Sequence, residues 1–151
     1  MAKPTKAKSK STKLKKTGIT GTKQSSQDVY SGVELLLTSY VPPFKLGDLA
    51  VKGKESIQLV TPKLVAIPGA YGGKPVNHQF AAAISQKGYV GFYLMGVYSN
   101  PSLKKRISPA LLKTLKGKSC FHLVAFDEQL KKDIVTALDA SATIYKERGW
   151  V

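Results

Sequence analysis

The clearest pattern in the chain is an alternation of apolar and polar residues in its central part. It occurs in two neighbouring segments, 77–86 and 89–98, which Lys87-Gly88 separates, and again in residues 119–124. Such alternation is typical of strands with one face in a core, because successive side chains of a strand point to opposite faces. The pattern predicts that these three segments are strands of one sheet.

The residues before these strands predict one helix, one hairpin and one loop. Apolar residues recur at helical spacing over 29–40, so we expect a helix there with Asp28 as its N-cap. Two short alternating segments, 45–52 and 55–61, are typical of a β-hairpin. Residues 66–76 are rich in glycine and proline, which favours a loop.

Three further helical segments are expected after residue 100. A short helical turn at 101–106 and a helix at 109–116 each begin with a proline after a capping residue, and Gly117 ends the second. Asp127 is the expected N-cap of the last helix, and Gly149 its C′ residue, with Trp150 folding back on the last turn. The apolar stripe of that helix comprises Leu130, Ile134, Leu138, Ala142 and Tyr145.

Together these elements predict an α+β fold. We expect an antiparallel sheet of about five strands flanked by helices, in the order α-β-β-β-β-α-β-α. Parity gives the sheet two unlike faces. Val90, Phe92, Leu94 and Tyr98 fall on one side of their strand, and the other side holds Tyr89, Gly91, Tyr93, Met95 and Val97. In the preceding strand Phe80, Ala82 and Ile84 share a face, and the set opposite them is smaller and more polar. This asymmetry predicts one face packed under helices and one face partly open.

The open face carries the candidate binding site. Cys120 and His122 alternate onto one side of the last strand, where they can lie beside the aromatic and polar tips of the neighbouring strand. Such tips on an open sheet face can bind an organic ligand or a protein partner. A second layer of core, or a homodimer interface, is the competing interpretation. The candidate ligand-binding residues are Tyr89, Tyr93, Met95, Cys120 and His122.

Charge divides the chain into a basic arm and a body. The formal net charge is +15, and residues 1–27 hold eight lysines and no acid. This segment is too poor in apolar residues to offset the entropy of ordering, so we expect a disordered tail at 1–27 and one domain at 28–151. The tail is either a solubilising segment or an arm that attracts nucleic acid without sequence preference. The lysines that would contact phosphate are Lys6, Lys8, Lys10, Lys13, Lys15 and Lys16.

Motifs for catalysis or cofactor binding are not favoured. Gly117-Lys118-Ser119 resembles the end of a phosphate-binding loop, but Leu112 stands where that motif needs its first glycine. Zinc requires three or four ligands, and Cys120 and His122 supply two, with His78 far away. Side chains two positions apart on a strand stand about 7 Å apart and parallel, which disfavours Cys120 and His122 as a catalytic pair. We therefore expect no enzymatic activity, no cofactor and no metal.

The cysteine content and hydropathy favour the cytoplasm. Cys120 is the only cysteine, so no internal disulfide can form, which is typical of a reducing compartment. No apolar run is long enough for a membrane span, and no apolar segment follows the basic N-terminus as in a secretory signal. We expect a cytoplasmic protein that does not contact a membrane.

The run GYVGFYLMGVYSNPSLKKRISPALLKTLKGKSCF, residues 88–121, resembles the YdhG-like family of small bacterial domains of unknown function. Gly73-Lys74-Pro75 and the closing Tyr145–Trp150 segment also fit, so the resemblance covers about residues 29–151. It implies an antiparallel α+β fold and little about activity. Some relatives in the broader family resemble iron-handling proteins of the frataxin type, which need an acidic surface, whereas this body carries net positive charge.

The sequence therefore predicts a non-enzymatic, cytoplasmic, YdhG-like binding domain for a small ligand or a protein partner. The alternative is an accessory nucleic-acid-binding protein that uses the lysine tail. The second alternative is a protein that handles iron or another metal.

Overall fold

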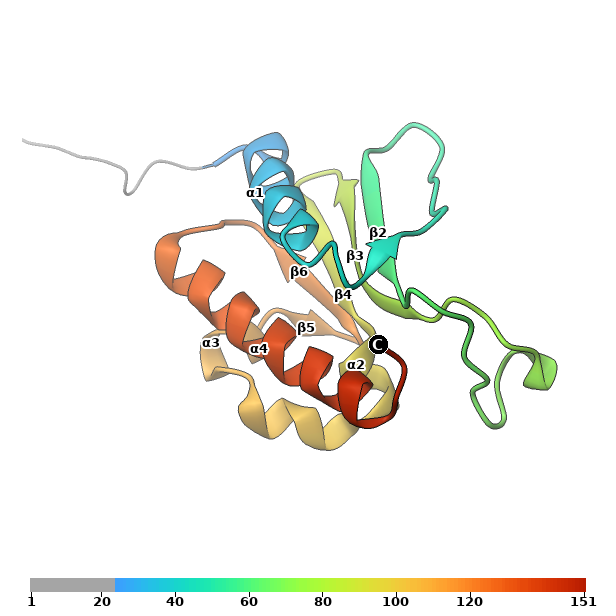
Figure 1. Cartoon of the computed structure of the whole chain (residues 1–151). Helices are drawn as coiled ribbons and strands as arrows, with labels where there is room; N and C mark the ends of the chain where they lie inside the picture. Colours follow the sequence, from blue (N-terminus) through green and yellow to red (C-terminus); the bar gives the residue numbers. More distant parts are fainter. Residues whose placement is uncertain (1–23) are drawn as a thin grey trace, which may run out of the picture.

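A computed structural model of the protein describes residues 24–151. Its centre is a six-stranded antiparallel sheet with the strand order β1-β2-β3-β4-β6-β5 (Figure 1). The predicted α+β class is confirmed, with one strand more than the five expected. The strands are β1 (Lys45–Leu46), β2 (Ser56–Val60), β3 (Gln79–Gln86), β4 (Tyr89–Leu94), β5 (Leu115–Lys116) and β6 (Cys120–Leu123).

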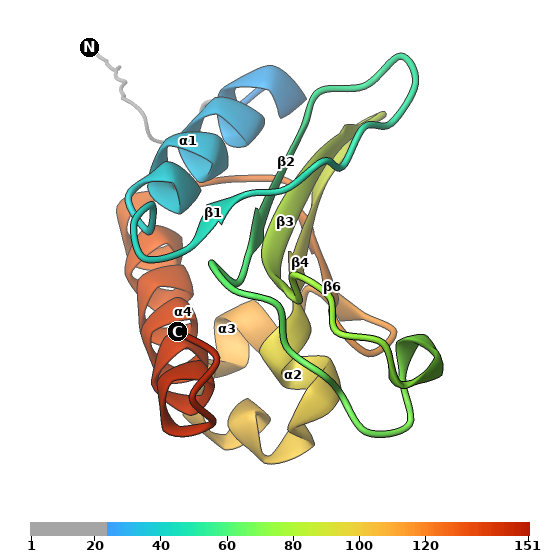
Figure 2. The same ribbon diagram turned by 45° about the vertical axis from the view of Figure 1, so that its right-hand side comes forward.

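Helices cover one face and one end of this sheet. The α-helices are α1 (Ser26–Thr38), α2 (Met95–Ser99), α3 (Pro109–Leu112) and α4 (Glu128–Glu147), and the 3-10 segments are η2 (Tyr71–Gly73) and η3 (Pro101–Arg106). Figure 2 shows α1 and α4 on the same side of the sheet, with α2, η3 and α3 gathered at its lower end. Within residues 24–151 no helix covers the opposite face, so one sheet face is open, as predicted.

The core lies between the sheet and the two long helices. Val90, Phe92 and Leu94 of β4 are completely buried there, as parity predicted. Across β3 the small side chains of Ala81 and Ala83 face the same way, which lets α1 pack closely on the sheet.

The domain begins earlier than residue 28. The hydroxyl of Ser25, not the carboxylate of Asp28, caps α1: it accepts the Asp28 N–H, and the Asp28 carboxylate accepts the Ser25 N–H in return. The amide of Gln24 pairs with the backbone of Phe126 just before α4. Residues 24–27 therefore belong to the folded unit, which corrects the predicted boundary. The tail lysines Lys6, Lys8, Lys10, Lys13, Lys15 and Lys16 lie outside the described residues.

β4 ends four residues before the predicted limit of its strand. Its ladder with β3 ends at Leu94 opposite Ala81, and its ladder with β6 ends at Tyr93 opposite Cys120. Beyond Leu94 little of the neighbouring strands remains, because β6 begins at Cys120 and β3 extends only two residues past Ala81, to Gln79. A helix satisfies its own N–H and C=O groups instead. Met95 therefore begins α2 and does not continue the face of Tyr93.

A register shift changes the parity of β3. Leu59 pairs with Ala81, but the next residue, Val60, pairs with Gln79, so Phe80 is the extra residue of a β-bulge. Phe80 consequently joins the core, where its ring stacks on that of Phe44 at a centroid distance of 3.8 Å. The prediction that Phe80 shares a face with Ala82 is wrong for this reason. The packed face of β3 is that of Ala81 and Ala83, and Ala82 and Ile84 lie on the open face.

The predicted hairpin is shorter than expected, and a second hairpin occurs that the sequence did not predict. In the first, only Lys45–Leu46 and Ser56–Val60 pair as strands, and Val51 and Lys54 form an isolated bridge around Gly53. In the second, the helix expected at 109–116 ends at Leu112 and the chain returns to the sheet as β5. Gly117 has a φ of 82° in the turn between β5 and β6, so it is a hairpin residue rather than a helix cap.

The last helix agrees with the prediction. The carboxylate of Asp127 accepts the Leu130 N–H at its start. At its end Gly149 has a φ of 74°, and the N–H groups of Gly149 and Trp150 bind the carbonyls of Lys146 and Tyr145. This pair of bonds is a Schellman motif, which folds Trp150 back on the helix. In the part of the chain that the structure describes, no helix has the length and apolar character needed to cross a membrane.

Candidate ligand-binding site

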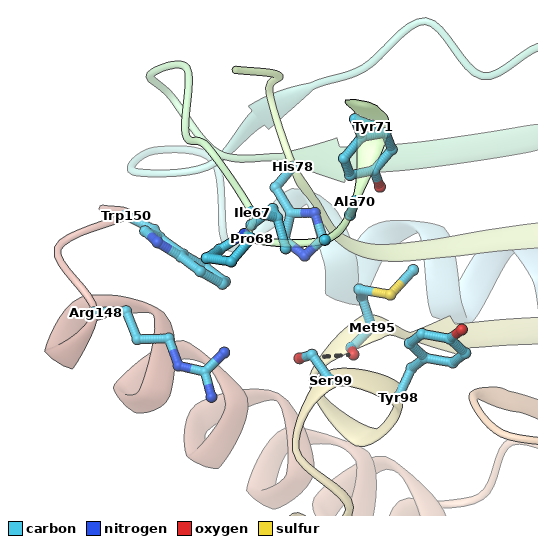
Figure 3. A pocket seen from close by; sticks show the side chains of 11 residues that line it. Ile67, Pro68, Ala70, Tyr71, His78, Met95, Tyr98, Ser99, Arg148 and Trp150 are labelled. Carbon is cyan, nitrogen blue, oxygen red and sulfur yellow. Dashed lines mark hydrogen bonds between the residues drawn. The ribbon is translucent and has the colours of Figure 1, made fainter. Parts of the chain in front are cut away.

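A cavity of about 790 Å³ lies where the sheet, α2 and the C-terminus meet (Figure 3). Its volume falls in the range of pockets for small organic ligands. Three segments that are far apart in the sequence form its walls: the loop before β3, helix α2, and the residues that follow α4. The lining residues are Ile67, Pro68, Gly69, Ala70, Tyr71, His78, Met95, Tyr98, Ser99, Arg148 and Trp150.

His78 is the buried polar group of this cavity. It directly precedes β3, and its backbone is fixed on both sides by Thr61, whose hydroxyl accepts the His78 N–H and whose N–H binds the His78 carbonyl, both at 2.9 Å. The residue is only 4% exposed, yet neither ring nitrogen has a hydrogen-bond partner among residues 24–151. A buried polar atom without a partner costs about 1–3 kcal/mol. This cost makes His78 a group that a bound ligand can satisfy.

The environment of His78 favours its neutral form. Burial lowers the pKa of His78 below its ordinary value of 6.5, and the positive charge of Arg148 lowers it further. A neutral imidazole carries one N–H donor and one nitrogen acceptor. His78 can thus donate one hydrogen bond to a ligand and accept another at neutral pH.

Aromatic rings surround the imidazole. The ring of Tyr145 stacks on it at 5.8 Å between centroids, and Trp150 and Tyr71 meet it edge-on at 5.2 and 6.2 Å. The Tyr145 hydroxyl donates to the carbonyl of Gln79, which holds the end of α4 against the start of β3. These contacts make a largely apolar frame that suits the flat body of an aromatic ligand.

Arg148 provides the charge of the site. Its guanidinium carbon lies 5.1 Å from the centre of the Trp150 ring, and Figure 3 shows both side chains on the same wall of the cavity. Arg148 is exposed, so its charge is accessible to a molecule that enters from solvent. None of the lining residues carries a carboxylate. The cavity therefore favours an anion over a cation.

The opposite wall depends on a close contact between α2 and α4. A Cβ atom added to Gly96 would lie 2.2 Å from the Ser141 Oγ, so only glycine lets the two helices approach this closely. The contact places Met95, Tyr98 and Ser99 against the cavity. The hydroxyl of Ser99 donates to the Met95 carbonyl, one turn earlier in α2, at 3.3 Å.

Four of the five predicted site residues lie together elsewhere, on the open sheet face. The rings of Tyr89 and His122 are stacked at 4.2 Å with 19° between their planes. Tyr93 and Cys120 are directly opposite each other on β4 and β6. Met95 is separate from this group, because it lines the cavity instead.

The surroundings of Cys120 do not suit a nucleophile. Burial raises the pKa of the Cys120 thiol, although a hydrogen bond with Tyr93 partly offsets the rise. Burial, followed by that same hydrogen bond, raises the pKa of Tyr93 to about 12. Both groups are therefore protonated at neutral pH, and the thiolate needed for nucleophilic attack is scarce. Among residues 24–151 no three His, Cys, Asp or Glu side chains come together as metal ligands.

Sequence reasoning missed the cavity although it predicted several of its parts. The sequence predicts the loop at 66–76 and the fold-back of Trp150, but it indicates His78 only as a candidate metal ligand. The sequence does place an arginine, Arg148, and the single tryptophan, Trp150, just after the last predicted helix, and Glu147 is the only acid next to them. This arginine and tryptophan pair was the feature of the sequence that could have indicated a binding site there.

Comparisons of the chain with family models, with curated proteins and with solved structures found no match. The resemblance to the YdhG-like family stays a prediction.

Proposed function

We propose that the protein is a non-enzymatic cytoplasmic binding module whose ligand is a small aromatic carboxylic acid. The observation that carries this proposal is His78, a buried imidazole with two unpartnered nitrogens in a cavity that contains a cation and no carboxylate. Isolated buried polar groups are costly unless something binds them, and this one faces a space large enough for a ligand.

Each part of the proposed ligand has a counterpart in the site. The carboxylate binds the guanidinium of Arg148 and the N–H donor of His78, since charge-assisted hydrogen bonds are the stronger kind. The flat ring packs among Trp150, Tyr71 and Met95, where aromatic and sulfur contacts favour it. The arrangement holds the ligand and provides no activated nucleophile, which supports binding rather than catalysis.

The test uses Trp150, the only tryptophan of the chain, as the reporter. Its single indole N–H resonance is followed by NMR while benzoate, or the neutral analogue benzamide, is added to the full-length protein. We expect benzoate to shift the resonance with a dissociation constant of about 1 mM, as suits so small a probe, and benzamide to bind several-fold more weakly.

Two variants separate the role of Arg148 from a general effect of positive charge. Arg148→Gln should weaken benzoate binding about tenfold, because it removes a charge-assisted pair. Lys146→Gln removes an exposed charge from the same helix end outside the lining of the cavity and should leave binding nearly unchanged. Equal effects of the two substitutions, or no response of the Trp150 resonance to benzoate, would contradict the proposal.

A further inference from the structure

The open sheet face has a chemical character that the cavity does not explain. Its central row runs across five strands through Gln58, Ala82, Tyr93, Cys120 and Lys116, which the strand registers place side by side. The next row contains Gly91 opposite His122, with the Tyr89 ring stacked on the imidazole. Aromatic rings thus occupy the middle of the face, and a lysine stands at its β5 edge.

The ring of Tyr93 lies flat on the sheet. A Cβ atom added to Gly91 would meet the Tyr93 ring carbon Cε2 at 3.2 Å and its hydroxyl oxygen at 3.4 Å, so the ring covers the backbone of Gly91. One side of the ring rests on the strand, and Tyr93 is only half-buried, so the other side faces solvent. Flat, half-exposed aromatic rings on a sheet are the surfaces on which unpaired bases stack.

Positive charge dominates the β4–β6–β5 side of this face, and Asp48 lies at its β2 end, in a groove that Gln58 also lines. Residues 56–126 contain nine basic residues and no acid, and all nine acids of the chain lie on α1, on the 45–55 segment, or on α4 and its cap Asp127. Lys116 lies on the face, and Lys118 and Lys104 continue from its edge: the Lys118 ammonium is 5.7 Å from the Tyr98 ring, and Lys104 lines the same groove. Phosphate groups are the ligands that such a row of lysines complements.

We propose that the open sheet face binds single-stranded nucleic acid. The bases stack on Tyr93 and on the Tyr89–His122 pair, and the backbone follows Lys116, Lys118 and Lys104 along the β5 edge. A duplex keeps its bases stacked inside, so it can engage the lysines but not the rings. This site shares Tyr98 at its edge with the aromatic-acid cavity, but it requires neither that ligand nor the tail lysines.

The test measures the fluorescence anisotropy of labelled oligonucleotides with the full-length chain. The probes are oligothymidylate and oligouridylate of about twelve nucleotides, and a duplex of the same length. In a variant with Lys6, Lys8, Lys10, Lys13, Lys15 and Lys16 changed to Gln, we expect weaker binding of all probes but a persistent preference for single strands. Salt raised from about 50 to 200 mM should weaken every interaction. The ratio of the affinities for oligouridylate and oligothymidylate shows whether the face prefers RNA or DNA.

Matched variants assign the preference to the rings. Changing Tyr89 and Tyr93 to Leu keeps apolar volume and should lower single-strand affinity about tenfold or more, with little effect on the duplex. Tyr71→Leu, an exposed aromatic of the cavity, and Lys146→Gln, an exposed lysine of α4, should leave the affinity nearly unchanged.

A second measurement needs no substitution. Cys120 is the only cysteine and lies beside Tyr93, so saturating oligonucleotide should slow its alkylation by iodoacetamide several-fold. Equal affinity for single strands and duplex, an unprotected Cys120, or a folded Tyr89→Leu, Tyr93→Leu protein that binds like the wild type would each overturn the proposal. So would equally effective competition by polyglutamate, which would assign the face to an acidic protein partner.

Discussion

Two buried polar side chains of the described chain lack protein partners, and they have different meanings. His78 lines a cavity, and its ring nitrogens are the groups that we propose a ligand binds. The hydroxyl of Ser141 is completely buried in the contact between α4 and Gly96 of α2, where no ligand can enter. We therefore regard the first as functional and the second as a cost of bringing two helices together.

This difference gives a prediction at the residue scale. Ser141→Ala should raise the free energy of unfolding by about 1 kcal/mol, because it removes a buried hydroxyl without a partner and leaves no large void. Urea denaturation checks this value. Gly96→Ala in the same contact serves as the control and should lower stability by about 1–3 kcal/mol through overpacking. A destabilised Ser141→Ala protein would show that the hydroxyl does have a partner.

At the scale of elements, the ends of helices and strands place the chemistry. The end of β4 moves Met95 off the open face and into the wall of the cavity. The Schellman motif at Gly149 returns Trp150 to the other wall. The loop between β2 and β3 closes the cavity with Tyr71, whose own φ of 53° lies in the left-handed region. The site is therefore formed mainly by residues at the ends of helices and strands and in loops, rather than by the faces of regular helices and strands.

The C-terminal motif of α4 is testable by itself. Gly149→Ala should destabilise the protein by about 1–2 kcal/mol, because an L side chain is strained at a φ of 74°. It should also shift the Trp150 indole resonance and weaken benzoate binding, since the Trp150 N–H depends on this turn. Gly149→Asn should cost less, because asparagine tolerates the left-handed conformation. If Ala and Asn are equally harmless, the turn does not position Trp150.

How much could be predicted from the sequence depends on the range of the interaction. Alternation correctly placed Tyr89, Tyr93, Cys120 and His122 on one open face, because strand parity is a local property. It failed at Phe80, where one extra residue in the β-bulge reverses the parity. It failed again at Met95, because the end of a strand depends on where its neighbours stop. The cavity joins segments about 80 residues apart in the chain, and no local period contains that information.

At the scale of the whole molecule, stability should depend on pH through His78. Its pKa is lowered in the folded state, so below 6.5 the unfolded chain binds more protons than the folded one. Its contribution to stability is therefore fully present above pH 6.5 and is lost as the pH falls towards the lowered pKa. The difference in unfolding free energy between wild type and His78→Phe, measured from about pH 7.5 to 5, isolates this effect from that of the carboxylates. As the pH falls, the unfolding free energy of the wild type should decrease relative to that of His78→Phe. A difference that stays constant with pH would contradict this prediction.

All nine acids lie on α1, on α4 with its cap, or on the 45–55 segment, whereas residues 56–126 carry nine bases; although α4 also carries Lys131, Lys132 and Lys146, this uneven distribution makes the molecule a dipole. The electric field of a polyanion orients such a dipole during the approach, so the β-sheet side of the protein contacts the polyanion first. The surface formed by α1 and α4 would then face solvent, on the side of the protein away from the bound polyanion. A protein held in that orientation presents its acidic side, including Glu34, Asp133 and Asp139, to whatever approaches next.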